Sequence, residues 1–267
     1  MKKVFLNYLV IAALAGAAAF TSCEKDGGND DEKNKENGAE VVKLLETSAR
    51  NVGDYIKYEY DNQNRITKVL GYYDGKVYST ETFTYSGDDL VKTVTVWTYP
   101  SEQNSTYDFV KSENGNTITV TEKWNGEEVG SPITITLNSN GLPAKMERSE
   151  EDWSRSLNYQ YQGNNFTKIT DKYTEGELVE EIASEYKYDN NKAPFYHCKT
   201  PKWYLIWSIQ GTIGVHNNMI EATWEDGKSV LTYDFDADGY PTKMTVKTVY
   251  DEDYEDEWER TFTYKVK

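Results

Sequence analysis

From Val41 onward, hydrophobic and polar residues alternate one by one, not in the three-to-four-residue rhythm of a helix. Ile56, Tyr58 and Tyr60, for example, are separated by single charged residues. Residues two apart share one face of a strand, so this pattern predicts β-strands with one buried and one wetted face. The same alternation returns along the chain at residues 91–97, 117–124, 133–137 and 258–266.

A short phrase also recurs. Tyr58-Glu59-Tyr60-Asp61 and the following Arg65-Ile66-Thr67-Lys68 form a strand, a polar turn and a second strand. Blurred copies follow at intervals of about 25 residues, the sign of one supersecondary unit used many times, here a β-hairpin. Pairs such as Asn140-Gly141 and Asp238-Gly239 separate the runs and supply the positive φ that tight turns need. We therefore expect about sixteen short strands, paired antiparallel in chain order.

So many strands do not remain a flat open sheet, because twist accumulates and exposed edges aggregate. The fold class expected is all-β: an up-and-down antiparallel meander of hairpin repeats, closed into a wide barrel or a strongly curved sheet. A barrel this wide cannot be filled by its own side chains. The apolar insertion at about 193–217 interrupts the repeat, and its stretch from Trp203 to Ile209 is the expected filling.

We do not expect this barrel to span a membrane. Its predicted apolar face consists mostly of tyrosine and is interrupted by Glu81, Glu122 and Glu180, whereas a lipid-facing band needs a continuous aliphatic stripe. Residues 41–51 are the one stretch where a helix is plausible. Apolar residues at 41, 44, 45 and 49 suit either one short helix or an irregular lead-in to the barrel.

The first forty residues have a different character. Residues 1–22 read as an export signal, with Lys2 and Lys3 before an alanine-rich apolar run and small residues before Cys23. This order is typical of a lipoprotein processing site that leaves Cys23 lipidated; the alternative is an ordinary signal peptide with a chance cysteine. Residues 23–40 contain almost no apolar side chain and read as a disordered acidic tether. The remaining residues, 41–267, are expected to form a single β-domain.

Net charge limits the classes of binding partner, and the cysteine count limits the disulfides that the chain can form. The formal net charge of −16 disfavours nucleic acid, which needs Lys and Arg to neutralise phosphate. Neutral partners such as glycans, or cationic ones, are expected instead. Of the two cysteines, Cys23 is assigned to the lipid, so the lone Cys198 has no partner for an internal disulfide.

Three resemblances rest on these features. The phrase from Tyr58 to Lys68 resembles a YD repeat of Rhs shell proteins, with Asn64 where those repeats usually carry glycine. Residues 41–267, with the lipoprotein start, acidic tether, repeated Tyr-x-Tyr-Asp hairpins and terminal Thr-Tyr strand, resemble a Bacteroidetes lipoprotein domain of unknown function described as porin-like. The acidic Asp/Gly/Asn run after Cys23 resembles the surface-export signal of Bacteroidetes lipoproteins and favours an outer-membrane lipoprotein exposed at the cell surface; the alternatives are a solubilising linker and a periplasm-facing anchor. The domain resemblance implies a barrel-like antiparallel sheet. It implies no activity, no catalytic residue and no cofactor.

Asp234, Asp236 and Asp238, followed by Gly239, copy the first half of a calcium loop. A complete loop needs a bidentate glutamate at its twelfth position, and that position holds Thr245. The alternative is a hairpin turn in the register of the repeat. The acidic run 251–257 is likewise expected to be a solvated loop rather than a cation site.

Several aromatic and reactive side chains could take part in binding or catalysis. Trp153, Trp203 and Trp207 are candidates for ligand binding by ring stacking, with ordinary core packing as the alternative. His197 and Cys198 are adjacent, so on an extended chain they point to opposite faces and cannot pair directly as base and nucleophile.

The sequence favours a non-enzymatic surface lipoprotein that binds a glycan, a protein or a small apolar ligand, without a cofactor. The alternative is a structural or adhesive envelope component with no small-molecule site. An enzyme that uses the carboxylates is a third and weaker interpretation.

Overall fold

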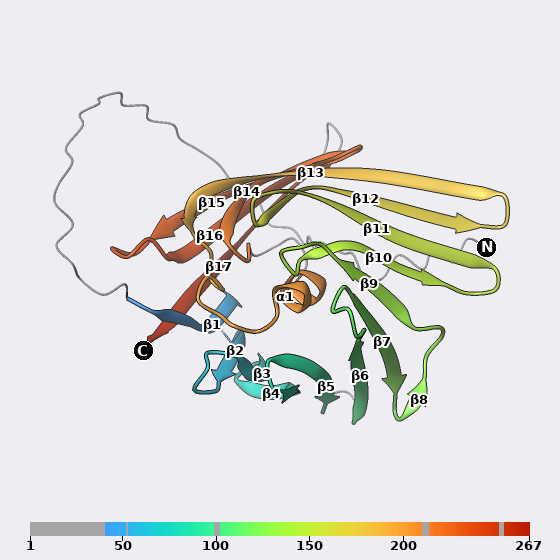
Figure 1. Ribbon diagram of the computed structural model, residues 1–267. Helices are drawn as coiled ribbons and strands as arrows, with labels where there is room; N and C mark the ends of the chain where they lie inside the picture. Colours follow the sequence, from blue (N-terminus) through green and yellow to red (C-terminus); the bar gives the residue numbers. More distant parts are fainter. Residues whose placement is uncertain (1–40, 52, 99–101, 210–213, 251–253) are drawn as a thin grey trace.

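The computed structural model describes residues 41–51, 53–98, 102–209, 214–250 and 254–267. The predicted export signal, Cys23, the acidic tether and part of the acidic run 251–257 lie outside these residues. The described chain forms strands throughout, with one helix inside them (Figure 1). The strands are β1 (Lys43–Asn51), β2 (Asp54–Tyr60), β3 (Ile66–Tyr73), β4 (Lys76–Ser86), β5 (Asp89–Trp97), β6 (Gln103–Lys111), β7 (Thr117–Trp124), β8 (Glu127–Glu128), β9 (Ile133–Leu137), β10 (Pro143–Ser149), β11 (Trp153–Gln162), β12 (Asn165–Glu175), β13 (Leu178–Lys192), β14 (Asn217–Trp224), β15 (Gly227–Phe235), β16 (Pro241–Tyr250) and β17 (Tyr254–Val266), and the helix is α1 (Lys202–Ile209).

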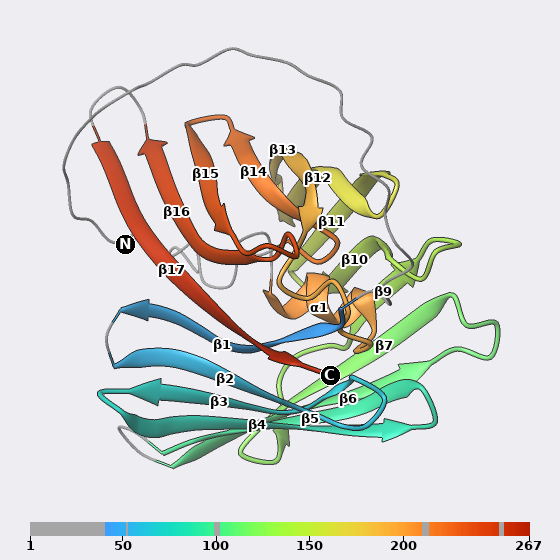
Figure 2. The same cartoon turned by 90° about the vertical axis from the view of Figure 1, so that its left-hand side faces the viewer.

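The strands close into a ring. Consecutive strands pair antiparallel, as the meander predicts, and β7 pairs with both β8 and β9, which together act as one interrupted strand. The ring closes because β1 pairs with β2 on one side and with β17 on the other, with Lys43 opposite Val266. The predicted all-β antiparallel barrel is therefore confirmed, and its closed form is the correct one of the two forms expected (Figure 2).

The two ends of the barrel differ. We call the end at which β13 leads into residues 193–216 and α1 the plug end, and the opposite end the far end. The turns at 61–65, 138–142 and 236–240 lie at the plug end, whereas those at 74–75, 125–126 and 225–226 lie at the far end. Residues 193–209, which we call the plug, fold back from the plug end into the ring (Figure 1).

The repeated phrase builds a recurring turn. The Asp61 carboxylate accepts hydrogen bonds from the backbone N–H of Gln63 and Arg65, both at 2.9 Å. Asn138 and Asp236 accept from the residues two and four further on in the same way. The third residue after each has positive φ: Asn64 at 67°, Gly141 at 72° and Gly239 at 79°. Asparagine tolerates this conformation, so Asn64 can stand where the other two turns carry glycine.

Tyrosine hydroxyls join neighbouring repeats near the plug end. Tyr60 donates to the carbonyl of Leu45 on the strand beside its hairpin, at 2.8 Å. Four more tyrosines make the same kind of bond at 2.7 to 2.8 Å: Tyr85 to Ile66, Tyr161 to Pro143, Tyr233 to Met219 and Tyr264 to Pro241. Tyr188, where the plug interrupts the repeat, is the exception: its buried hydroxyl has no hydrogen-bond partner among the described residues.

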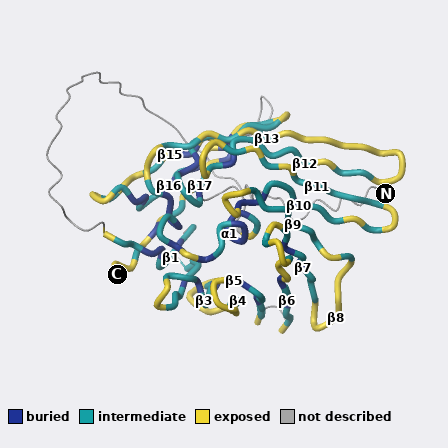
Figure 3. The backbone as a smooth tube through the Cα atoms, viewed as in Figure 1, coloured by how far each residue is buried: buried dark blue, intermediate teal, exposed yellow. Residues whose placement is uncertain are grey.

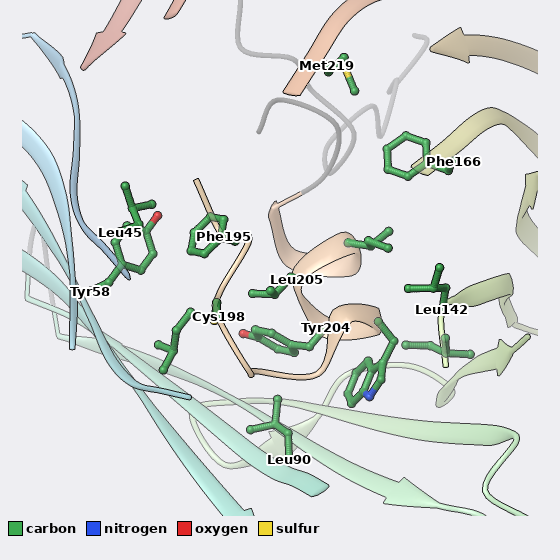
Figure 4. Close-up of a cluster of buried hydrophobic side chains, with 14 of the residues drawn as sticks. Leu45, Tyr58, Leu90, Leu142, Phe166, Phe195, Cys198, Tyr204, Leu205 and Met219 are labelled. Atoms are coloured by element: carbon green, nitrogen blue, oxygen red, sulfur yellow. The ribbon is translucent and has the colours of Figure 1, made fainter. Parts of the chain in front are cut away.

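The core lies where the plug meets the wall. Tyr204 and Leu205 of α1 are buried, and inner side chains of strands from all around the ring pack against them (Figure 4). Phe109 of β6 makes edge-to-face ring contacts with Trp203 and Tyr204. A helix surrounded by walls has no wetted face, so it is apolar nearly all round. The structure thus places the apolar insertion where the sequence analysis expects it, inside the ring (Figure 3).

Hydrogen bonds tie the plug to the hairpin of β2 and β3 and also stabilise the plug internally. The Thr200 hydroxyl accepts the backbone N–H of Ile66 at 2.8 Å, and Lys199 N donates to the Asn64 carbonyl at 2.9 Å. The Lys202 ammonium donates to the carbonyls of Phe195 and Cys198. Burial lowers the pKa of Lys202, because a low-polarity surrounding disfavours the charged form.

The helix considered for residues 41–51 is wrong: Lys43–Asn51 is strand β1. Its pairing with β17 shifts register between Leu45 and Thr47, which marks a β-bulge. A bulge adds one residue and changes the phase of the strand, so Leu44 and Leu45 are both buried and Ser48 is buried three residues later. That spacing of apolar positions imitates a helical period.

Candidate binding face inside the barrel

Side chains that point into the ring change character between its two ends. On β17, Phe262 belongs to the core, and Arg260, Trp258 and Asp256 follow at every second position toward the far end. Residues two apart share a face of a strand, so all four point inward. On β11, Leu157 is followed in the same way by Arg155 and Trp153. The inner face is therefore apolar near the plug and aromatic and charged toward the far end.

Aromatic residues on this inner face form pairs across neighbouring or nearby strands. The ring centroids of Trp97 and Trp124 lie 5.4 Å apart, and Trp124 is 39% exposed, so solvent reaches the inner face here. Two further pairs lie around the ring: Trp153 with Tyr173 at 6.3 Å and Trp224 with Tyr250 at 5.8 Å. We call these six residues the inner aromatic set. Five of the six are the terminal residue of their strand at the far end, and Tyr173 lies two residues before the end of β12.

The position of Trp224 depends on a glycine. An added Cβ at Gly227, the residue opposite Trp224 on β15, would lie 2.6 Å from the indole. The indole therefore lies over the bare backbone of Gly227, a packing mode that compensates for glycine in a strand.

Ion pairs lie between the aromatic pairs. Arg148 contacts Glu122 at 3.1 Å, and the Tyr107 hydroxyl donates to the same carboxylate at 3.1 Å. Arg155 donates from Nε to both oxygens of Asp171, at 2.9 and 3.2 Å, and this bonding raises the pKa of Arg155. Partly buried ion pairs with several hydrogen bonds fix the geometry of a surface more than they stabilise the fold.

A third charged group lies at the seam between β1 and β17. The Arg50 guanidinium lies 4.7 Å from the ring centroid of Trp258, and the Arg260 guanidinium lies 5.4 Å from the same ring. Burial lowers the pKa of Arg260, and the nearby Arg50 lowers it further, although Tyr58 acts in the opposite direction.

The predicted ligand-binding tryptophans take two different places. Trp153 belongs to the inner aromatic set at the far end and is half-buried. Trp203 and Trp207 belong to α1, where Trp203 is buried and Trp207 packs edge-to-face on Tyr107 of β6. The structure therefore does not bring the three together in one contact cluster: two fill the core and one faces the open end.

The predicted calcium aspartates do not gather as ligands. Asp236 and Asp238 both contact the Lys43 ammonium, at 2.7 and 2.6 Å, while Asp234 is exposed on β15. Partial burial would raise the pKa of Asp236, but bonds from Lys43 and two backbone N–H groups hold it below its ordinary value. Among the described residues, no group of three or more His, Cys, Asp or Glu side chains is placed to hold a metal ion.

His197 and Cys198 lie in the plug. Cys198 is a free, buried thiol, and burial raises its pKa, which disfavours the reactive thiolate. The His197 ring packs near Tyr196 and Tyr240. The outer face carries a shallow depression of about 430 Å³ near the turn between β14 and β15, lined by residues that include Glu225, Lys228 and Lys247.

Sequence reasoning missed Arg50, Arg260 and most of the inner aromatic set. A signal was present for Arg260, because it shares the alternation of Trp258 and Phe262. Charged residues are ordinarily assigned to the wetted face of a strand, and only a closed ring with an accessible inside makes an inward arginine meaningful.

Together, the pairings and the plug define a closed antiparallel β-barrel with a helix inside it. No protein-family model and no curated protein matches the chain. Among solved structures, it is similar to a porin-like protein from Bacteroides uniformis ATCC 8492, with a TM-score of 0.47 and 15% identity over 85% of this chain and 96% of that chain. The fold rests here on the strand pairings themselves. No described helix has the length and apolar character needed to cross a membrane.

Proposed function

We propose that the protein is a lipid-anchored protein of the cell envelope that binds a saccharide on the inner face of its barrel at the far end. The inner aromatic set carries this proposal. Paired indole and phenol rings offer flat apolar faces to sugar rings, and nearby polar groups bind hydroxyls, which is the composition of a small-molecule site. The ion pairs of Arg148 and Arg155 supply such polar groups between the aromatic pairs.

The proposed location follows from the first forty residues and from the outer wall. Lys2, Lys3, the apolar run and Cys23 support lipidation, and the acidic stretch after Cys23 supports surface display on an outer membrane. The outward positions of the strands carry cross-strand ion pairs, such as Lys187–Glu221 at 2.8 Å and Lys247–Glu255 at 2.8 Å. Charges on the outward face are costly in hydrocarbon, so we propose that the barrel stands in water on its anchor.

Binding is tested with a glycan array followed by calorimetric titration of the purified chain. We expect Trp153→Ala and Trp97→Ala to weaken binding of a saccharide identified on the array. The matched control is Tyr72→Ala, which disrupts a stacked pair with Tyr55 (ring centroids 4.2 Å apart) on the outer face. Equal loss in the control, or saccharide binding that no inner aromatic variant weakens, would contradict the proposal.

The anchor is tested separately. We expect Cys23→Ser to move the protein from the membrane fraction to the soluble fraction and to abolish labelling by a clickable fatty acid. Labelling that persists in this variant would rule out Cys23 as the lipidated residue.

A second candidate, a structural or adhesive role, is favoured by the hairpin of β12 and β13. Leu178, Val179 and Ile182 are exposed by 48%, 59% and 47%, and they point to both faces of β13, so no described residue covers this apolar tip. Light scattering tests this role by measuring the molar mass in solution. A wild type that assembles, together with a monomeric Val179→Lys variant, would favour the structural or adhesive role over a saccharide-binding monomer.

A further inference from the structure

Arginine and lysine occupy different places in this barrel. The chain has only five arginines against a much larger number of lysines. One of them, Arg65, lies in a plug-end turn over the ring of Tyr85. The other four point inward on strands of the far half: Arg50, Arg148, Arg155 and Arg260. In a chain of net charge −16, this inner face gathers nearly all the guanidinium groups.

Two of the four have their charge neutralised by neighbouring acids. Arg148 pairs with Glu122 and Glu150, and Arg155 pairs with Asp171. Their side chains are therefore committed to the wall of the barrel. Arg148 and Arg155 therefore serve as a comparison for Arg260: they are inward arginines whose charge has an acidic partner.

Arg260 differs from both. Within the residues that the structure describes, its guanidinium forms no ion pair and lies 5.4 Å from the ring centroid of Trp258. Arg50 approaches the same indole from β1, so two positive groups converge on one ring. Burial and this like charge both lower the pKa of Arg260. A partly buried, uncompensated charge is unfavourable unless an opposite charge arrives.

Among the described residues of the wall, none supplies that opposite charge to Arg260. Asp256 is the next acid on the inner face of β17, yet both of its carboxylate oxygens are buried and have no hydrogen-bond partner among the described residues. Glu81, on β4, accepts the hydroxyl of Tyr204 at 2.6 Å instead. Arg260 is half-buried rather than sealed, so part of the residue remains accessible to solvent.

We propose that Arg260, with Arg50 beside it across Trp258, binds the anionic group of an acidic saccharide, a carboxylate or a sulfate. This inference rests on the proposed function and adds the ligand class. Guanidinium groups suit this task because their donors match the oxygens of carboxylate and sulfate in pairs. The inner aromatic set then stacks on the sugar rings, and the arginine pair selects saccharides by charge.

The test compares three probes of equal length by calorimetric titration of the purified chain: a uronic-acid oligomer, a sulfated neutral-sugar oligomer and the unmodified neutral oligomer. The variants are Arg260→Gln and Arg260→Lys, with Lys243→Gln as the control. Lys243 faces outward on β16 opposite Thr261, the neighbour of Arg260, so its loss removes the same charge from the other side of the wall. Thermal melts confirm that each variant folds.

We expect the wild type to bind at least one anionic oligomer more tightly than the neutral one, with affinity that falls as salt rises. Arg260→Gln weakens that binding by about tenfold or more, Arg260→Lys recovers only part of it, and Lys243→Gln leaves it unchanged. The preferred probe identifies the anion as carboxylate or sulfate. Equal binding of neutral and anionic oligomers overturns this inference and leaves the proposed function standing. No binding of any oligomer, together with a silent glycan array, overturns both.

Discussion

The hydroxyl of Tyr204 on α1 lies 2.6 Å from Glu81 Oε1 on β4. This bond joins the plug to the barrel wall at a partly buried carboxylate. Burial raises the pKa of Glu81, and the bond from Tyr204 only partly offsets that effect. The folded protein therefore keeps the proton on Glu81 to a higher pH than the unfolded chain does.

This relationship gives a pH dependence. Between the ordinary glutamate pKa and the raised pKa of Glu81, unfolding releases a proton, so the free energy of unfolding contributed by Glu81 falls as pH rises. We expect Glu81→Gln to remove this fall. The measurement is urea unfolding of both proteins at a series of pH values. A difference between the two proteins that stays constant from roughly pH 4 to 8, a range that covers the ordinary glutamate pKa and a raised one, would contradict the prediction.

The tyrosine bonds between repeats predict two unequal losses. Tyr161→Phe removes the bond to the Pro143 carbonyl and leaves that carbonyl without its partner, so we expect a loss of about 1 kcal/mol in the free energy of unfolding. Tyr188→Phe is the matched control, because its buried hydroxyl has no partner among the described residues. We expect that change to be neutral or stabilising. Chemical denaturation measures both, and equal losses would show that the bond contributes nothing.

Filling of the ring by the plug predicts a large penalty for truncating α1. Leu205 is fully buried, so Leu205→Ala leaves a cavity, and we expect a loss of about 2–5 kcal/mol. Leu178→Ala, at a side chain 48% exposed on β13, is expected to change stability by less than about 0.5 kcal/mol. Thermal and urea unfolding provide the comparison. A small effect at Leu205 would mean that the plug is not part of the cooperative core.

The turn at 236–240 predicts a structural rather than a metal-binding role for its aspartates. Asp236 accepts two backbone N–H groups and contacts Lys43, so we expect Asp236→Ala to lose about 1–2 kcal/mol. Asp234→Ala is the control, because Asp234 is exposed on β15, and we expect little change. Calcium is expected to leave the melting temperature of the wild type unaltered. A calcium-dependent rise that Asp236→Ala abolishes would instead establish a metal site.

Much of the architecture was predictable because each hairpin carries its own sequence signals: alternating residues for the strands and a Gly, Asn or Asp pair for the turn. The run from Tyr58 to Lys68 alone predicts a strand, a polar turn and a second strand, and its copies predict the meander. The number of strands argued against a flat open sheet, but it left a closed barrel and a strongly curved sheet as alternatives. β1 was not predictable, because the bulge between Leu45 and Thr47 depends on its pairing with β17, and local sequence carries no trace of a partner strand more than two hundred residues away.

The candidate site was less predictable for a different reason. The sequence alternation assigns Arg260 and Trp153 to one face of a strand but cannot say whether that face is wetted. In a plugged ring the same inner face is buried beside α1 and accessible to solvent at the far end. Trp203 and Trp207 were proposed on residue type alone, and the structure places them where the walls meet the helix.

Ring closure has a consequence for how the protein is made. The hydroxyls of Thr47 and Thr263 lie 2.6 Å apart but are separated by 216 residues in the chain. During synthesis, the backbone groups on one edge of β1 therefore lack their partner strand until β17 has been made. Contacts so distant in sequence form slowly. A nascent barrel of this kind is vulnerable to joining with another unfinished copy, so the cell gains from keeping it unfolded until the last strand is available.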